Sequence, residues 1–391
     1  LRDQALAYKE DFLSGTSSAA CGGVTTVLDM PNNEPLTAGS AAVLERVALA
    51  KDRALVNVGF YAAPGPSLDG LEDTAKAGII GFKLFLSRKL GGVNVEDDDL
   101  LKGFFRETAR LSIPVVVHAE DYTLLERARQ EMVSAGRDDV EAYLKVHNPR
   151  AEQVAVRRAL RLTEELDVKL HFAHVSLGSS LSAVYSAKTR GRRVSMEVTP
   201  QHLLLSRSLI LEMGSVALAD PPLRSPRTRA ALWGGLTSGL VDSVASDHAP
   251  HTLEEKNHQD IWQVRTGFPG LDTLLPLLLT EVNSGRLTLQ RLATLTSSGP
   301  ARIFGLTHRG TLKLGSWADL VVVDVRKESV IDPTRFRSKA HFSPFRCKRV
   351  RGLPTMTFVN GVKIMDEQEI TASPGTGSIV RGPFAPQGFR G

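Results

Sequence analysis

The chain has 391 residues, of which 42% are hydrophobic and 23% are charged, close to the averages of soluble globular proteins. It is long enough for one large domain or two ordinary ones, and its composition argues against disorder along the whole chain. The net charge is +5, and the lysines and arginines are spread along the sequence. Because no basic stripe is interleaved with aromatic residues, we expect no nucleic-acid partner.

The two cysteines, Cys21 and Cys347, lie far apart and outside any C-x-x-C pattern. This spacing excludes a disulfide framework and a cysteine-rich zinc site, and it fits a reducing cytoplasm. No stretch approaches the ~20 apolar residues that a membrane-spanning helix needs. The first residues, Leu1-Arg2-Asp3, lack the pattern of a signal peptide, and we expect the chain to begin inside a larger fold.

Short apolar runs rich in β-branched residues alternate with helical patterns, such as those at 38–52 and 151–165. Continuous apolar runs of this kind predict parallel strands buried on both faces. An open doubly wound sheet would carry a glycine-rich phosphate turn after its first strand, and this chain has none there. The seven runs are residues 24–29, 55–62, 79–86, 113–118, 168–175, 193–198 and 241–246.

Seven strands predict a (β/α)8 TIM barrel that lacks one of its eight strands. Since the chain begins abruptly, we expect the missing strand to be the first. In TIM barrels the active site lies at the carboxyl ends of the strands. Six of the runs end on or beside a polar or ionisable residue, as this rule requires: Asn32, Lys83, His118, His174, Glu197 and Asp247.

The pattern changes after a helix near 289–303. Residues 310–312 and 318–324 predict strands, and the segments on either side of Asn360-Gly361 predict a hairpin. Glycine and proline are frequent after Ala372, without periodicity. We therefore expect a barrel over 1–305, a small β-sandwich module over 306–371 and a disordered tail over 372–391.

Three residues at the ends of different strands suggest a metal site: His118, His174 and Asp247. Zinc takes imidazole nitrogen and carboxylate oxygen, and a catalytic site keeps one position open for water. Each histidine alone is more often a packed residue, but together they favour a shared site. Lys83 lies within an apolar strand, where a bare ammonium is costly to bury and its pKa falls readily. A neutral lysine can form a carbamate with carbon dioxide, although an ordinary ion pair is the alternative.

Several segments closely resemble the dihydroorotase family. They are SDHAPHTLEEKN at 246–257, GFPGLDTLLPLLL at 267–279, VTTVLDMPN at 24–32, FKLFL at 82–86, VVHAE at 116–120 and EVTPQHLLLS at 197–206. The resemblance extends from Leu1 to about Met365. In this family the first strand ends in His-x-His-x-Arg-Asp, and Leu1-Arg2-Asp3 matches the end of that motif. We therefore expect two ligand histidines upstream of Leu1.

The resemblance implies two zinc ions, bridged by carboxylated Lys83. His118 and His174 would bind one metal, and Asp247 would bind the other and move the proton. The implied reaction is the reversible cyclisation of N-carbamoyl-L-aspartate to L-dihydroorotate in de novo pyrimidine biosynthesis. Without the upstream histidines, we expect this polypeptide to be inactive and perturbed in its folding.

The resemblance also implies that Arg2, Asn32 and His251 hold the substrate carboxylate. It places Glu197 and His202 near the site without defining a role for either. The loop at 87–94 follows the Lys83 strand and contains two glycines, so a mobile lid and an ordinary turn are equally good interpretations.

Two other functions stay open. Dihydropyrimidinases and allantoinases share the barrel and the lysine, but they usually lack a histidine at the position of His251. A catalytically silent scaffold for aspartate transcarbamoylase is the second alternative, and the retained metal-binding residues argue against it. We expect a small-molecule substrate, a cytoplasmic location and either a homodimer or an association with aspartate transcarbamoylase.

Overall fold

The computed structural model describes residues 1–384, and a seven-stranded parallel sheet lies at its centre. The strands lie side by side in chain order, each paired in parallel with the next. This arrangement confirms the α/β fold of the TIM-barrel type and the seven strands expected from the sequence. The strands are β1 (Thr26–Asp29), β2 (Asn57–Ala62), β3 (Gly81–Phe85), β4 (Val115–His118), β5 (Leu170–Phe172), β6 (Val194–Val198) and β7 (Ser243–Val244).

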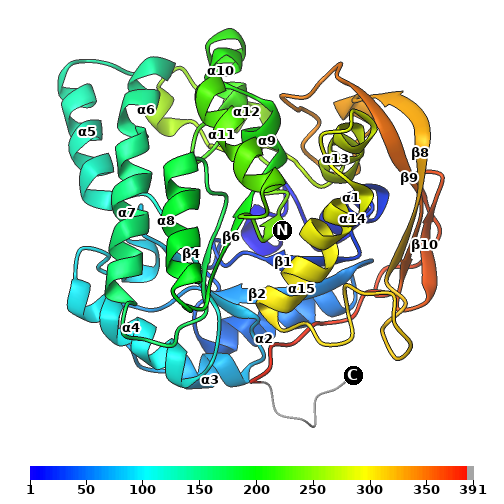
Figure 1. Ribbon diagram of the computed structural model, residues 1–391, viewed down its shortest axis with the longest axis horizontal. Coiled ribbons are helices and arrows are strands. Elements are labelled where there is room, and N and C mark those ends of the chain that lie inside the picture. The colour runs from blue at the N-terminus through cyan, green and yellow to red at the C-terminus, as the bar shows by residue number, and fades with distance from the viewer. Residues whose placement is uncertain (385–391) are drawn as a thin grey trace.

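Helices follow the strands and cover the outer face of the curled sheet (Figure 1). No helix within residues 1–384 is both long and apolar enough to cross a membrane. The helical segments, with η5 a π-helix and the other η segments 3-10 helices, are η1 (Gln4–Leu6), α1 (Phe12–Cys21), α2 (Gly39–Lys51), α3 (Leu71–Lys76), η2 (Leu90–Gly92), α4 (Asp98–Arg110), α5 (Tyr122–Ser134), α6 (Val140–Val146), α7 (Pro149–Leu162), α8 (Gly178–Thr189), α9 (Pro200–Leu204), α10 (Arg207–Met213), η3 (Gly214–Ala217), α11 (Pro226–Thr237), α12 (Leu253–Lys256), η4 (Ile261–Gln263), α13 (Leu274–Asn283), α14 (Leu289–Ala293), η5 (Thr294–Ser298), α15 (Gly299–Phe304) and η6 (Pro333–Arg335).

Every residue of β2, β3, β4, β5 and β7 is buried, and the alternation of side chains along a strand decides which of them enter the barrel. In β3, Phe82 packs edge-on against Phe104 of α4, so this side chain points outward to the helices. Its neighbour Lys83 therefore points inward. In β4, Val117 belongs to the outer core and His118 to the inner face. The same periodicity that buries the apolar residues thus aims the ionisable ones at the barrel axis.

The two edge strands of the sheet are β1 and β7, and within residues 1–384 they do not pair with each other. Residues of both strands line the same large cavity. The described sheet is therefore a barrel wall with one open side.

A second, antiparallel sheet packs beside the barrel, in strand order β11-β10-β9-β8. Asn360 and Gly361, both at positive φ, join β9 to β10 and confirm the predicted hairpin. The strand expected at 310–312 is absent from the described structure, so that expectation is wrong. We find one four-stranded sheet where the sequence suggested a small sandwich. Its strands are β8 (Leu320–Val330), β9 (Arg349–Val359), β10 (Val362–Asp366) and β11 (Glu369–Ile370).

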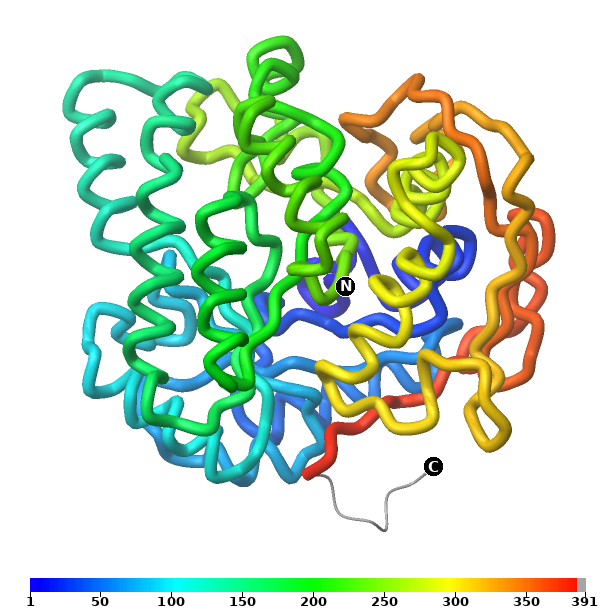
Figure 2. The backbone as a smooth tube through the Cα atoms, in the orientation of Figure 1, coloured from blue at the N-terminus to red at the C-terminus, as the bar shows by residue number. Residues whose placement is uncertain are grey.

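The chain beyond Ala372 differs from the expected disordered tail. Val58 of β2 donates its N–H to Ser378 O and accepts the N–H of Val380, at 2.9 and 2.8 Å. The segment therefore runs along β2, at the opposite side of the barrel from α10 and α12 (Figure 2). Glycine at 377 and 382 lets the backbone approach closely, because a Cβ there would lie 2.1 and 2.0 Å from backbone oxygens of the barrel. Residues 385–391 lie outside the described part.

Candidate functional site

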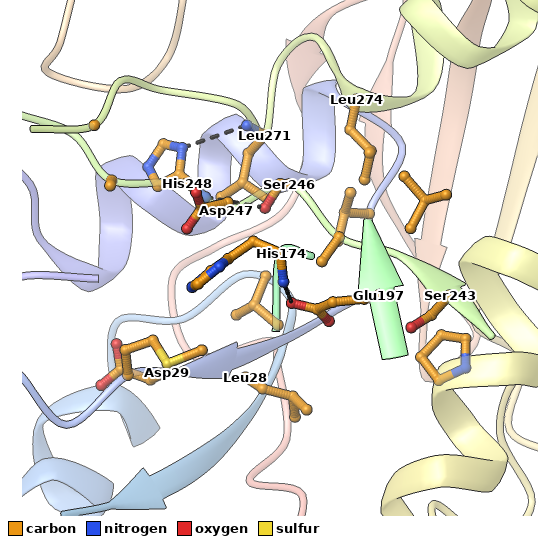
Figure 3. A pocket seen from close by; sticks show the side chains of 18 of the residues that line it. Leu28, Asp29, His174, Glu197, Ser243, Ser246, Asp247, His248, Leu271 and Leu274 are labelled. Carbon is orange, nitrogen blue, oxygen red and sulfur yellow. Dashed lines mark hydrogen bonds between the residues drawn. The ribbon is translucent and has the colours of Figure 1, made fainter. Parts of the chain in front are cut away.

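The carboxyl ends of the parallel strands open into one cavity of about 2020 Å³. The residues predicted as metal ligands and those predicted to bind substrate all line it. Figure 3 shows His174, Glu197 and Asp247 around this cavity, with β1 below them. The residues selected from the sequence therefore all lie on the wall of one cavity: Lys83, His118, His174, Asp247, Arg2, Asn32 and His251.

His118 and His174 face each other across neighbouring strands. Nδ1 of His118 lies 3.2 Å from Nε2 of His174, and the ring centroids are 4.7 Å apart. Burial, with His118 and Lys83 close by, holds the pKa of His174 well below its usual value, so this imidazole is neutral at pH 7. His174 also has a φ of 36°, in the left-handed region. Two converging imidazoles, one of them firmly neutral, are suitable donors for a transition metal.

Lys83 is one of the largest fully buried side chains of the protein. Within residues 1–384, Nζ forms no hydrogen bond and no carboxylate oxygen lies within ion-pair distance; its near neighbour is the ring of Phe85, at 5.0 Å. Burial lowers the pKa of this amine to about 8, although Glu197 and Asp247 oppose the change. The ordinary ion pair weighed in the sequence analysis is therefore not present in the described residues. An appreciable share of the amine is neutral near pH 7.5, which is the form that reacts with carbon dioxide.

Asp247 follows β7 and lines the same cavity as Lys83. Gln201 Nε2 donates to its Oδ2 at 3.3 Å. Burial raises the pKa of Asp247 to about 7, and Lys83 only partly offsets this effect. A carboxyl group with such a pKa can both take up and release a proton at neutral pH.

Next to His118 lies a cluster that the sequence analysis did not identify as a site: Glu120, His147 and Asp220. Glu120 Oε2 lies 3.1 Å from His118 Nε2 and 3.2 Å from His147 Nδ1. Asp220 Oδ1 has no hydrogen-bond partner within residues 1–384, although His147 Nδ1 is 3.4 Å away. His118, Glu120 and Asp220 could together hold a metal ion, because one ligand atom from each lies within 4.8 Å of the others. The segment VVHAE offered a signal for Glu120, whereas nothing in the sequence singled out Asp220.

The side chains expected to bind a carboxylate line one part of the cavity. Arg2 donates through an NH1 proton to Asn32 O at 3.1 Å, and its buried Nε has no partner among the described residues. His251 Nδ1 lies 3.0 Å from Glu255 Oε2 and 3.4 Å from Lys9 Nζ. Burial lowers the pKa of His251 to about 3, so the ring is neutral. Lys9 and Glu255, which the sequence analysis did not select, therefore decide which nitrogen of His251 carries the proton.

Glu197 and His202 have different surroundings. Glu197 lines the cavity and accepts hydrogen bonds from His171 Nε2, at 3.1 Å, and from the backbone N–H of His174, at 3.4 Å. His202 does not line the cavity; it bridges Thr199 Oγ1 and Pro221 O. Glu197 thus belongs to the site, and His202 joins two loops beneath it. His171 is a buried hydrogen-bond partner of Glu197.

The loop at 87–94 contains η2 and lies at the cavity mouth. Arg88 packs its guanidinium over the Phe85 ring, 4.3 Å from the centroid. Gly91 and Gly92 both have positive φ, which fits a tight turn. Whether the loop closes over a ligand stays a prediction.

The amidohydrolase family model matches residues 3–364 of this chain. A dihydroorotase of Methanothermobacter thermautotrophicus is 34% identical over 376 residues, which cover 96% of this chain and 83% of that protein. An L-hydantoinase of Paenarthrobacter aurescens is 34% identical over 372 residues, covering 93% of this chain and 81% of that protein. An allantoinase of Solibacter usitatus is 35% identical over 381 residues, covering 95% and 82%.

Among solved structures, the L-hydantoinase (dihydropyrimidinase) from Arthrobacter aurescens superposes with a TM-score of 0.93 at 33% identity. The match covers 97% of this chain and 86% of that one. Relatives named for different cyclic substrates are thus about equally similar to this chain. Identity alone does not distinguish among those substrates.

Proposed function

This chain belongs to the amidohydrolase family, and we propose that within this family of cyclic amide hydrolases it acts as a dihydroorotase. The proposed reaction is the reversible cyclisation of N-carbamoyl-L-aspartate to L-dihydroorotate in pyrimidine biosynthesis. One observation carries the proposal: Arg2, Asn32 and His251 line the same cavity as Lys83 and Asp247. Dihydroorotate bears a carboxylate, whereas hydantoin, dihydrouracil and allantoin bear none.

The donor set fits zinc. His118 and His174 offer imidazole nitrogens 3.2 Å apart, Lys83 is buried without a counter-ion in the described residues, and Asp247 is a carboxyl group among other acids. We propose that carboxylated Lys83, His118, His174 and Asp247 hold two zinc ions. Cations at this position supply Lewis acidity and lower the pKa of water towards ~7.

The remaining steps belong to side chains of this chain. Arg2 offers a planar guanidinium that matches a carboxylate, and its unpartnered Nε is available for this purpose. Lys9 and Glu255 act in opposite directions on His251, because Glu255 accepts only from a protonated Nδ1 and Lys9 donates only to an unprotonated one. We propose that the bound anion selects the second tautomer, in which Nε2–H donates to it. Asp247 carries the proton between water and the ring nitrogen, because its raised pKa lets it exchange protons near neutrality.

The substrate is tested by assaying L-dihydroorotate, dihydrouracil, hydantoin and allantoin side by side. We expect hydrolysis of dihydroorotate by the chain to which the expected first strand and its two histidines have been added, as described below. The Arg2→Met variant should lose most of this activity, with a smaller effect on any residual turnover of the uncharged rings. Turnover of dihydrouracil, hydantoin or allantoin without dihydroorotate would overturn the substrate assignment. It would favour the dihydropyrimidinase, hydantoinase or allantoinase alternative that the relatives also support.

We also propose that an eighth strand fits between β1 and β7, because both of these outer strands line the cavity and neither pairs with the other in residues 1–384. The test adds, upstream of Leu1, an apolar strand ending in the His-x-His that the family motif places before Arg2-Asp3. Zinc content and dihydroorotate hydrolysis should rise over those of the 391-residue chain. Absence of zinc from the extended protein would favour the silent-scaffold alternative. The cytoplasmic location, the homodimer and the association with aspartate transcarbamoylase stay predictions.

A further inference from the structure

His248, the residue after Asp247, uses both of its ring nitrogens inside the protein. Nδ1 accepts the backbone N–H groups of Gly270 and Leu271, at 3.1 and 3.3 Å. Figure 3 shows the bond to Leu271 beside Asp247. Nε2 lies 3.2 Å from Glu10 Oε2. A backbone N–H can only donate, so Nδ1 is unprotonated and Nε2–H donates to Glu10. Neither nitrogen is left for a metal or a substrate.

Glu10 is a fixed anchor for this imidazole. Its side chain is fully buried, and it also accepts hydrogen bonds from Ser14 of α1 and from Ser338, the latter at 2.5 Å. A buried carboxylate with three donors has little freedom to move. The anchor thus joins α1 and the C-terminal part of the chain to the segment after β7.

The backbone around Asp247 needs such support. Asp247 has a φ of 47°, a left-handed conformation that costs a non-glycine residue about 1 kcal/mol or more. On one side of it, Ser246 O lies so close to Gly270 that a Cβ there would be 2.6 Å away. On the other side, Ala249 donates its N–H to Phe268 O at 3.1 Å. The segment 246–249 is therefore held against residues 268–271, and His248 provides the bond at its centre.

We propose that His248 and Glu10 form a positioning pair that holds the backbone of Asp247 in its left-handed conformation and so aims the Asp247 carboxylate into the cavity. The role rests on the proposed function of Asp247. Neither residue of the pair contacts substrate in this scheme; each acts through the orientation of Asp247.

The first test is structural and uses the metal-free protein. His248→Phe fills the site but removes all three hydrogen bonds, whereas His248→Gln can still accept from the 270–271 backbone and donate to Glu10. In crystal structures we expect Asp247 to leave positive φ in His248→Phe and to retain it in His248→Gln. Retention of the conformation in His248→Phe would overturn the proposal. Should that variant not fold, His248→Asn, whose amide is too short to bridge both sides, takes its place with the same two outcomes.

The second test uses the protein extended upstream of Leu1 by the strand that carries the two histidines. It measures the zinc affinity of the folded protein by competition with a chelator. Loss of a residue that orients a metal ligand typically lowers affinity about tenfold to a hundredfold, and we expect this loss in His248→Phe, with His248→Gln within about threefold of the wild type. Ser338→Ala is the matched control, because it removes another bond to Glu10 and leaves the bond to His248. It should lower the melting temperature without changing zinc affinity.

The two proposals fail in different ways. Zinc affinity that is equal in the wild type and His248→Phe would refute the positioning pair alone. If the wild-type protein carrying the added strand and its two histidines bound no zinc, the proposed metal site would be refuted, and the crystallographic comparison at Asp247 would then decide the pair by itself.

Discussion

Replacing Lys83 by methionine should stabilise the metal-free protein at neutral pH. Burial lowers the pKa of Lys83 from 10.5 to about 8, so the folded state disfavours the charged amine. The two pKa values differ by about 2.5, and each pKa unit corresponds to about 1.4 kcal/mol, which gives a cost of roughly 3 kcal/mol. This cost is fully present below pH 8, declines as the pH rises through the interval from 8 to 10.5, and is absent above it. Methionine has a similar length and needs no counter-ion.

The assay is urea unfolding of both proteins, followed by tryptophan fluorescence in buffers free of carbon dioxide and metal. We expect the variant to be more stable by about 3 kcal/mol at pH 7 and close to the wild type at pH 10.5. A variant less stable than the wild type at pH 7, or a difference that is the same at both pH values, would refute the reasoning.

Lys256 provides a matched control for this prediction. It is equally buried, and burial lowers its pKa to about 7. Its Nζ, however, donates to Leu218 O at 3.0 Å and to Gly267 O at 2.9 Å. Lys256→Met leaves these carbonyls without a donor. At pH 10.5, where the cost of a buried charge is absent, we expect it to lose about 2 kcal/mol or more, whereas Lys83→Met stays close to the wild type. The difference between the two substitutions at pH 10.5 would separate the benefit of these hydrogen bonds from the cost of a buried charge.

Three further outcomes follow from the same structure. Burial raises the pKa of Asp247 from 3.8 to about 7, so its contribution to the stability of the metal-free protein is present below pH 3.8 and lost as the pH rises through 7. Asp247→Asn should therefore gain about 4 kcal/mol at pH 8 and little at pH 4 in urea unfolding. Lys9→Met should weaken binding of orotate about tenfold by calorimetry, because Lys9 no longer donates to Nδ1 of His251 and the Nε2–H tautomer is less favoured. Tyr8→Phe, which removes only a hydrogen bond to Glu255, should leave the affinity unchanged. Equal affinities of the Lys9→Met variant and the wild type would count against this role of Lys9. Deletion of residues 373–391 should lower the melting temperature by several degrees, because the hydrogen bonds to the backbone of Val58 are lost, and it should leave kcat/KM unchanged. A fall in kcat/KM at a temperature where the protein is folded would show that this segment affects activity as well as stability.

The fold and much of the cavity lining could be predicted because strand alternation governs both. Phe82 and Lys83 are neighbours in the sequence, and the period of two sends one to the helices and the other to the barrel interior. The parallel arrangement then brings His118, His174 and Asp247 to the same end of the sheet. These positions follow from local patterns, which a sequence displays directly.

Other parts of the site depend on how loops pack, and no local pattern encodes that. Asp220 and His147 come from loops far apart in the chain, and only tertiary packing brings each within 4 Å of the other. Lys9 meets His251 in the same way, across more than 240 residues. His202 is an example of the opposite error. Its segment resembles the family closely, but its ring lies outside the cavity and forms hydrogen bonds with Thr199 and Pro221.

The expectation of a disordered tail after Ala372 came from composition. Composition shows that a hydrophobic pattern is absent, but it does not show whether a segment can pair with a strand of the barrel. Its glycines permit close approach to the barrel backbone, where Val58 supplies both a donor and an acceptor. Glycine content alone cannot separate a flexible segment from one that lies flat against a strand.

The left-handed backbone at His174 and Asp247 has a practical consequence for mutagenesis. Aspartate and histidine adopt the left-handed conformation more readily than alanine does, so alanine scanning at these two positions would add backbone strain to the loss of the functional group. Any drop in activity would then overstate what the side chain does. Glycine relieves the strain but loosens the unfolded chain, and asparagine tolerates the conformation while keeping nearly the same size. Comparing Gly, Asn and Ala at each position would divide the measured loss into a chemical part and a conformational part.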